Sequence, residues 1–226
     1  MTQTHTEPET GCPTAPDGEP LTRTTAWFYK FTAPSRRRAR DEKRILMVDV
    51  ELTDKCFGGC VYCFASGRKE SNFFIPRERM FGLIDEAKEI GLRQVLLIGG
   101  EPLLHPDWYD FSRYTLDQGM RSVICSTGDH YTPKIAKTIV HDLKIQENGY
   151  CTIHIPTINQ QAYEQICPGN PQGLKTRIRG LYTLLEAGYP PEKVYCQLVL
   201  CQPILESLEE TVDWLVVVFG FSLVVL

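Results

Sequence analysis

The sequence lacks the features of a membrane, secreted or nucleic-acid-binding protein. Its most apolar uncharged run, residues 214–226, is shorter than the roughly 17 to 25 residues of a membrane-spanning helix. Residues 1–20 are rich in Thr, Pro and Glu, without the basic start and apolar core of a secretory signal. Lys and Arg total 24 against 28 for Asp and Glu, a net charge of -4. The sequence therefore predicts no membrane association and no nucleic-acid partner.

Nine cysteines are present, but they do not form the pattern of a disulfide framework. Their number is odd, and three of them crowd into residues 56–63, which suits a metal centre better than a set of disulfides. Thiols persist in reducing compartments, so we predict a cytoplasmic protein.

The chain divides into a polar N-terminal part and a patterned remainder. Residues 1–44 are predicted to be a flexible tail followed by a basic linker, because the tail has few apolar residues and residues 36–44 are rich in Arg and Lys. A solvated linker is the preferred interpretation of the basic run, and a lip that attracts an anionic substrate is the alternative. Residues 45–226 are predicted to form one core domain.

In this core, short apolar runs alternate with longer stretches of helical periodicity, which predicts an α/β fold with a parallel sheet. The predicted strands are Ile45 to Leu52, Gln94 to Ile98, Ser122 to Ser126, Cys151 to Pro156, Val194 to Leu200 and Ser222 to Leu226. The predicted helices are Pro76 to Gly91, Trp108 to Gln118, Pro133 to Leu143, Leu174 to Ala187 and Leu205 to Val217. Six right-handed βα units can curl into a partial (β/α)6 barrel, whose function sits at the carboxyl ends of the strands.

Three cysteines follow the first predicted strand at ligand spacing. Cys56, Cys60 and Cys63 are separated by three and two residues, and Gly58 and Gly59 allow the backbone to wrap a compact centre. A structural zinc site needs a fourth ligand, and no second Cys-x-x-Cys occurs in the chain. Three thiolates on an iron-sulfur cubane would leave one iron open to a ligand. A non-catalytic iron-sulfur or zinc-binding module remains the alternative.

A second motif, Gly99-Gly100-Glu101, follows the next predicted strand. The absence of two side chains lets backbone groups approach a ligand closely, and the carboxylate of Glu101 can accept from a cationic amino group. Both motifs follow neighbouring strands, so they are expected to face each other.

With Cys56-x-x-x-Cys60-x-Tyr62-Cys63 and Gly99-Gly100-Glu101 together, the sequence resembles the radical S-adenosylmethionine (radical SAM) superfamily over about residues 45–226. The resemblance is nearest to the peptide- and protein-modifying (SPASM or twitch-type) enzymes and the molybdenum-cofactor cyclases. It implies a 4Fe-4S cluster on the three cysteines and SAM bound at Gly99, Gly100 and Glu101. It also implies an oxidoreductase in which reductive cleavage of SAM gives a 5'-deoxyadenosyl radical. That radical would abstract hydrogen from a peptide, a protein or a cofactor precursor, with a flavodoxin- or ferredoxin-type electron donor.

The resemblance assigns two further residues to the cofactor, Tyr62 near the adenine and Ser126 at the polar end of the third strand. His154 ends the fourth strand and either contacts the cofactor carboxylate or caps the strand. His105, just before Pro106, is predicted to be structural. The scattered cysteines are predicted to be buried core thiols. They are Cys125, Cys151, Cys167, Cys196 and Cys201, and Cys12 has no predicted role.

Residues 221–226 have the pattern of a buried strand with no helix after it to cover the sheet. We therefore expect the natural protein to continue beyond Leu226 into a C-terminal region that covers the barrel and selects the substrate.

Overall fold

The computed structural model describes residue 31 and residues 33–218, 220 and 222–225. They fall into two units, divided after Leu46. In the first unit, Ala33–Asp41 form helix α1. The predicted basic linker, residues 36–44, is therefore largely helical: arginine has good helix propensity, and after the end of α1 the Arg44 N–H donates to the Ala39 carbonyl at 2.7 Å. The predicted tail, residues 1–24, lies outside the described residues.

The second unit is built on one parallel sheet whose strands follow the order of the chain, β1-β2-β3-β4-β5-β6. No pairing closes β1 onto β6 among the described strands, so the sheet is an open α/β arrangement, as predicted. The strands are β1 Met47–Glu51, β2 Gln94–Ile98, β3 Arg121–Ser126, β4 Gly149–His154, β5 Val194–Leu198 and β6 Ser222–Val225. The predicted strands agree with these to within a few residues at each end.

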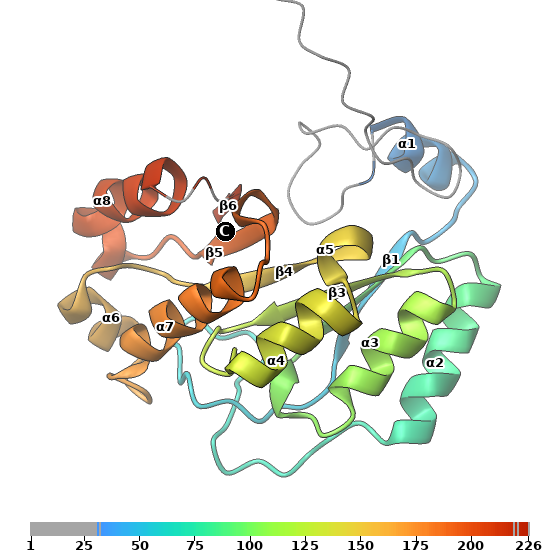
Figure 1. Ribbon diagram of the computed structural model, residues 1–226, viewed down its shortest axis with the longest axis horizontal. Helices are drawn as coiled ribbons and strands as arrows, with labels where there is room; N and C mark the ends of the chain where they lie inside the picture. The colour runs from blue at the N-terminus through green and yellow to red at the C-terminus, as the bar shows by residue number, and fades with distance from the viewer. Residues whose placement is uncertain (1–30, 32, 219, 221, 226) are drawn as a thin grey trace, which may run out of the picture. The chain divides into compact units, whose positions relative to one another are not determined.

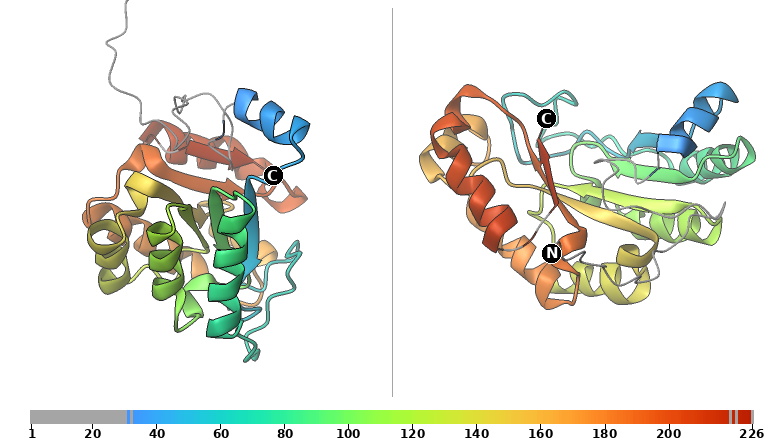
Figure 2. Two further views of the ribbon diagram at one scale, coloured as in Figure 1. Left: turned by 90° about the vertical axis from the view of Figure 1, so that its right-hand side faces the viewer. Right: turned by 90° about the horizontal axis from the view of Figure 1, so that it is seen from above.

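Helices connect the strands and cover one face of the sheet, as Figures 1 and 2 show for α2, α3, α4 and α7. The α-helices of this unit are α2 Arg77–Glu89, α3 Trp108–Asp117, α4 Pro133–Lys137, α5 Ile145–Asn148, α6 Gln160–Ile166, α7 Gly173–Glu186 and α8 Leu208–Val212. Helix α4 continues as a π-helix over Thr138–Asp142, and α8 continues as another over Asp213–Val218. Short 3-10 turns occupy Pro102–Leu104, Pro191–Lys193 and Gln202–Ser207.

Alternate residues of β1 to β5 face this helical layer. Val50, Leu97, Ile124 and Ile153 all belong to the hydrophobic core, together with Met80, Ile84 and Ala87 of α2. The helix predicted to reach Gly91 ends at Glu89, and the side chain of Ile90 is 59% exposed. The core holds the strands in fixed register, and register places the loops after them side by side.

No helix among residues 33–218 is long and apolar enough to cross a membrane.

Candidate cofactor site

The Gly99-Gly100 pair joins the loop after β2 to the loop after β1. The Gly100 N–H donates to the Thr53 carbonyl at 2.6 Å, and the Glu101 N–H donates to the Lys55 carbonyl at 2.8 Å. A Cβ on Gly100 would lie 2.3 Å from the Lys55 oxygen, closer than any side chain can approach. The two glycines thus allow a direct contact with the backbone that leads into Cys56. The glycines were predicted to let the backbone approach a ligand, whereas the atoms that they approach in this structure are backbone atoms of the loop after β1.

The cysteine loop brings two of its three thiols to one glycine. A Cβ on Gly58 would lie 3.3 Å from the sulfur of Cys60 and 3.5 Å from that of Cys56. The Gly58 N–H also donates to the Cys56 sulfur at 3.3 Å, and the Cys63 N–H donates to the Cys60 carbonyl at 3.1 Å. All three cysteines are half-buried free thiols. Across the described part of the chain, no three Cys, His, Asp or Glu side chains form a group that could hold a metal ion.

The environment of the thiols affects their protonation. Burial raises the pKa of the Cys56 thiol to about 11, so this residue must lose a proton when it binds a metal. Cys60 differs because the thiol of Cys167 lies 3.4 Å from its sulfur and, by hydrogen bonding, lowers the pKa of Cys60.

Glu101 is almost fully buried and ties β2 to the end of β3. Its Oε2 accepts from the Thr127 N–H at 2.8 Å and from the Thr127 hydroxyl at 2.6 Å, and its Oε1 accepts from the Leu103 N–H at 3.3 Å. A carboxylate oxygen can accept two hydrogen bonds. Oε2 already accepts two hydrogen bonds from Thr127, whereas Oε1 accepts one from Leu103 and can accept one more. Ser126, expected near the cofactor, uses its hydroxyl to accept from the Gly128 N–H at 3.0 Å.

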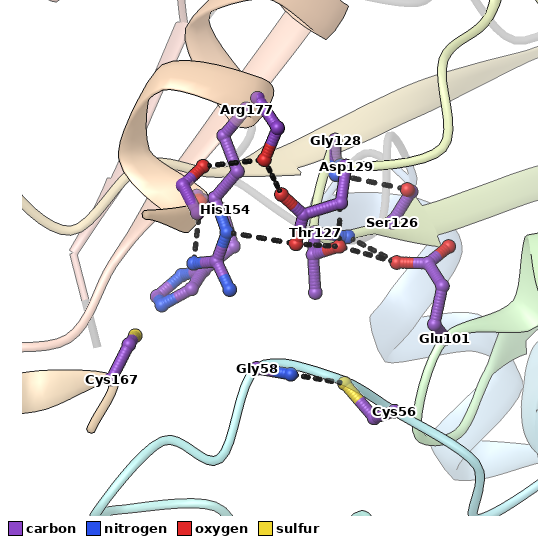
Figure 3. A network of polar contacts seen from close by, with 12 residues as sticks. Cys56, Gly58, Glu101, Ser126, Thr127, Gly128, Asp129, His154, Cys167 and Arg177 are labelled. Carbon is purple, nitrogen blue, oxygen red and sulfur yellow. Dashed lines mark hydrogen bonds and ion pairs between the residues drawn. The ribbon is translucent and has the colours of Figure 1, made fainter. Parts of the chain in front are cut away.

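A buried cation faces the cysteine loop from α7. Arg177 has no exposed surface; its Nε donates to Asp129 at 3.4 Å, and its Nη1 donates to the His154 carbonyl at 3.1 Å. Its Nη2 has no partner among the described residues and lies 3.1 Å from the position of a Cβ on Gly58. In Figure 3 the guanidinium lies below Asp129 and above the loop that carries Gly58, with Glu101 to the right. A buried N–H without a partner is costly and indicates a place for an acceptor.

Tyr62 and His154 contact each other. The Tyr62 hydroxyl is hydrogen-bonded to His154 Nε2, and His154 Nδ1 lies 3.1 Å from the Gln197 carbonyl. A carbonyl only accepts, so Nδ1 carries a proton and donates to Gln197, while Nε2 bonds the tyrosine hydroxyl. Burial raises the pKa of Tyr62, which keeps its phenol protonated. The histidine at the end of β4 therefore orients the tyrosine of the cysteine motif.

Comparison with known proteins identifies the family. The model of the radical SAM superfamily matches residues 50–215, most of the chain. The chain belongs to the radical SAM superfamily. The predicted family is thereby confirmed, and the family implies SAM and a 4Fe-4S cluster as cofactors.

Two curated relatives illustrate this membership. An AdoMet-dependent heme synthase of Methanosarcina barkeri is 30% identical over 145 residues, which is 62% of this chain and 39% of the relative. A probable GTP 3',8-cyclase of Methanosarcina mazei is 27% identical over 180 residues, 76% of this chain and 51% of the relative. The chain thus spans at most about half the length of these relatives.

Solved structures share the fold. Streptococcus suis SuiB bound to S-adenosylmethionine has a TM-score of 0.66 at 15% identity, over 85% of this chain and 44% of SuiB. The enzyme anSMEcpe with bound AdoMet has a TM-score of 0.63 at 12% identity, over 80% of this chain and 51% of that protein. The predicted α/β fold of a radical SAM core is therefore confirmed.

The remaining predictions for single residues have mixed outcomes. His105 is buried: its Nε2 lies 3.0 Å from the Ile75 carbonyl and its Nδ1 accepts from the Asp107 N–H at 3.0 Å, as a structural residue would. Cys151 and Cys196 are buried core thiols as expected, whereas Cys125 and Cys201 are only partly buried. Cys167 is buried but lies against the cysteine loop rather than in an inert part of the core. Cys12 lies outside the described residues.

Three residues of this site were not predicted from the sequence, namely Thr127, Asp129 and Arg177. The signal for Thr127 and Asp129 was their position directly after β3, next to Ser126. Arg177 gave no usable signal, because an arginine in an amphipathic helix is usually exposed. Its full burial becomes visible only when α7 packs over β4.

Proposed function

We propose that this chain binds a 4Fe-4S cluster through Cys56, Cys60 and Cys63, cleaves SAM reductively and uses the resulting 5'-deoxyadenosyl radical to take hydrogen from a substrate. The observation that carries the proposal is that two buried ionisable side chains, the carboxylate of Glu101 and the guanidinium of Arg177, both come from segments that contact the cysteine loop. When bound, the cluster would supply the electron and SAM the radical. The chain's own residues would bind, orient and shield these groups.

The donor set fits such cofactors. Thiolates are the ligands of iron-sulfur clusters, and two of the three thiols already flank Gly58. An amino acid carries one positive and one negative group, and SAM ends in such a pair. The unpartnered Nη2 of Arg177 suits the carboxylate, and the remaining acceptor capacity of Glu101 Oε1 suits the amino group. Tyr62, oriented by His154, remains our proposal for the contact with the adenine.

Replacing Arg177 with lysine should weaken SAM binding by roughly 10- to 100-fold, because the variant loses a charge-assisted hydrogen bond worth about 1.5 to 3 kcal/mol. Equilibrium dialysis with the reconstituted protein measures this change. Arg179→Lys is the matched control, since Arg179 lies on the same helix with an exposed side chain. Equal affinity in the two variants would remove Arg177 from the proposed site.

Replacing Glu101 with glutamine should also weaken SAM binding, by about 1.5 to 3 kcal/mol, because an amide cannot pair with an ammonium group as a carboxylate does. Glu101 also binds Thr127, so part of any loss comes from the fold. Thr127→Val removes the hydroxyl but keeps the carboxylate, and its melting temperature and SAM affinity isolate that structural part. If both variants lost the same affinity, Glu101 would be a structural residue alone.

The overall function is tested by anaerobic reconstitution with iron and sulfide. We expect close to four irons and four sulfides per chain, and formation of 5'-deoxyadenosine when a reductant and SAM are added. Zinc binding without iron uptake would instead support a non-catalytic metal-binding module.

The partners also belong to the proposal. We propose a flavodoxin- or ferredoxin-type protein as electron donor, and a peptide or a small molecule as substrate. One structural neighbour, SuiB, has been solved bound to its precursor peptide SuiA, which supports testing short peptides first.

A further inference from the structure

Cys167 is a thiol of the site that the proposed function does not use. It is fully buried at the C-terminal end of α6, and its sulfur lies 3.4 Å from the sulfur of Cys60. Of the two thiols, only Cys60 is partly exposed. Packing alone does not require a buried cysteine to contact another thiol. Here the thiol that Cys167 contacts belongs to Cys60, a proposed cluster ligand.

The backbone holds the two cysteines together. The Val61 N–H, next to Cys60, donates to the Ile166 carbonyl, next to Cys167, at 2.9 Å. Beyond them, a Cβ on Gly59 would lie 2.8 Å from the Cα of Gly169, so the two glycines are in direct backbone contact. Gly59 also has a φ of 58°, in the left-handed region that favours glycine. The segments 59–61 and 166–169 therefore contact each other at two points, the Val61–Ile166 hydrogen bond and the Gly59–Gly169 contact, which hold the two thiols close together.

A shared metal explains this pair less well than a direct bond between the sulfurs. A four-thiolate zinc site needs four sulfurs around a single ion. Within the described ranges, no three Cys, His, Asp or Glu side chains form a group that could hold one metal ion. Two sulfurs at 3.4 Å are already in van der Waals contact, and a disulfide would bring them to about 2.05 Å.

We propose that Cys60 and Cys167 form a reversible disulfide when the cysteine loop holds no metal, and that this bond withdraws Cys60 from the ligand set. The disulfide itself depends only on the geometry above, whereas its effect on cluster loading rests on the proposed function. The oxidant is a small-molecule disulfide of the glutathione type. The partly exposed Cys60 attacks it, forms a mixed disulfide and releases one small thiol. Cys167 then attacks the sulfur of Cys60 and releases the second small thiol, so atoms and electrons balance.

The test starts from the metal-free full chain, treated anaerobically with oxidised glutathione, then unfolded, alkylated and digested. Cys56, Cys60 and Cys63 lie between Lys55 and Arg68, so one tryptic peptide carries all three and tandem fragmentation must assign the bond. We expect Cys60 linked to Cys167 as the main product, and its disappearance on reduction. In Cys167→Ser we expect Cys60 to remain as the glutathione mixed disulfide. Cys196→Ala, which removes a buried thiol of β5, should keep the bond.

Several results would overturn this inference. Cys60 linked mainly to Cys56 or Cys63 is one, and Cys167 recovered alkylated is another. Zinc binding that is weakened at least tenfold by Cys167→Ser would make Cys167 a metal ligand instead.

A second measurement separates this inference from the proposed function. We expect the oxidised protein to take up iron and sulfide at least tenfold more slowly than the reduced protein, and reduction to restore the rate. Cys167→Ser, with its mixed disulfide removed, should load normally. If the disulfide forms but iron uptake is unchanged, the ligand role of Cys60 is wrong. If iron uptake needs Cys60 but no disulfide forms, the inference is wrong and the proposed function stands.

Discussion

Alanine at Cys56, Cys60 or Cys63, one at a time, is expected to abolish the brown iron-sulfur chromophore and the cleavage of SAM together. The reason is coordination: two thiolates cannot hold a cubane that needs three protein ligands, so each single variant should lose the whole cluster. Iron and sulfide per chain, the visible absorption spectrum and 5'-deoxyadenosine release measure the effect after anaerobic reconstitution. We expect iron below about one-tenth of the unmodified protein in each variant.

Cys196→Ala is the matched control for these variants. It also removes one thiol, but from the buried face of β5 and away from the cysteine loop. We expect it to keep the full iron content with a small loss of stability. Full iron retention in Cys56→Ala or Cys63→Ala, or in Cys60→Ala combined with Cys167→Ala, would remove the loop cysteine concerned from the ligand set. Retention in Cys60→Ala would be especially informative, because Cys167 is close enough to replace it.

The sheet could be predicted from the sequence because each strand is a short apolar run between helical stretches. Buried parallel strands are apolar on both faces, so runs such as 94–98 stand out from their surroundings. Helices with clear amphipathic periodicity, such as α2 and α3, were found for the same reason. The elements that were missed have little such signal. Helix α6 is short and depends on Asn159, whose side chain accepts from the Ala162 N–H at 2.9 Å, and α1 is dominated by arginine.

The candidate site was predictable only where its residues are close together in the sequence. The cysteine loop and the Gly99-Gly100-Glu101 segment each carry a local pattern, and the parallel topology places them at one edge of the sheet. Arg177 and Cys167 come from α7 and from the end of α6, more than 100 residues after the cysteine loop. Their roles depend on burial and on packing between distant segments, which local patterns do not encode.

The polar contacts of the site form a continuous chain. Glu101 binds Thr127, the Thr127 hydroxyl accepts from the Asp129 N–H at 3.4 Å, and Asp129 pairs with Arg177, whose Nη1 reaches the end of β4 (Figure 3). The charges on Asp129 and Arg177 are both largely shielded from solvent. Buried charges without partners are costly, so this series of contacts keeps the ends of the strands in one arrangement. It also fixes the positions of Glu101 and Arg177, the charged residues at its two ends, relative to the cysteine loop.

Gly100→Ala is the second substitution with a large expected effect. Its Cβ would lie 2.3 Å from the Lys55 oxygen and 2.6 Å from the Lys55 carbonyl carbon, and backbone atoms cannot rotate away as a side chain can. The loops after β1 and β2 would have to separate. We expect a loss of roughly 3 kcal/mol in the free energy of unfolding, the upper part of the usual range for overpacking. That corresponds to a fall of about 6 to 12 °C in the melting temperature.

Gly82→Ala gives the matched comparison for Gly100→Ala. Gly82 lies within α2, and a Cβ there would meet no atom within 4 Å. Alanine is the better helix former, so this variant should gain about 0.5 to 1 kcal/mol. Thermal unfolding of the metal-free chain compares the two variants without any cofactor. SAM binding by the reconstituted protein should be lost in Gly100→Ala and kept in Gly82→Ala, because only Gly100 aligns Glu101 with the cysteine loop. A Gly100→Ala protein as stable as the unmodified chain would show that the junction between the two loops can yield.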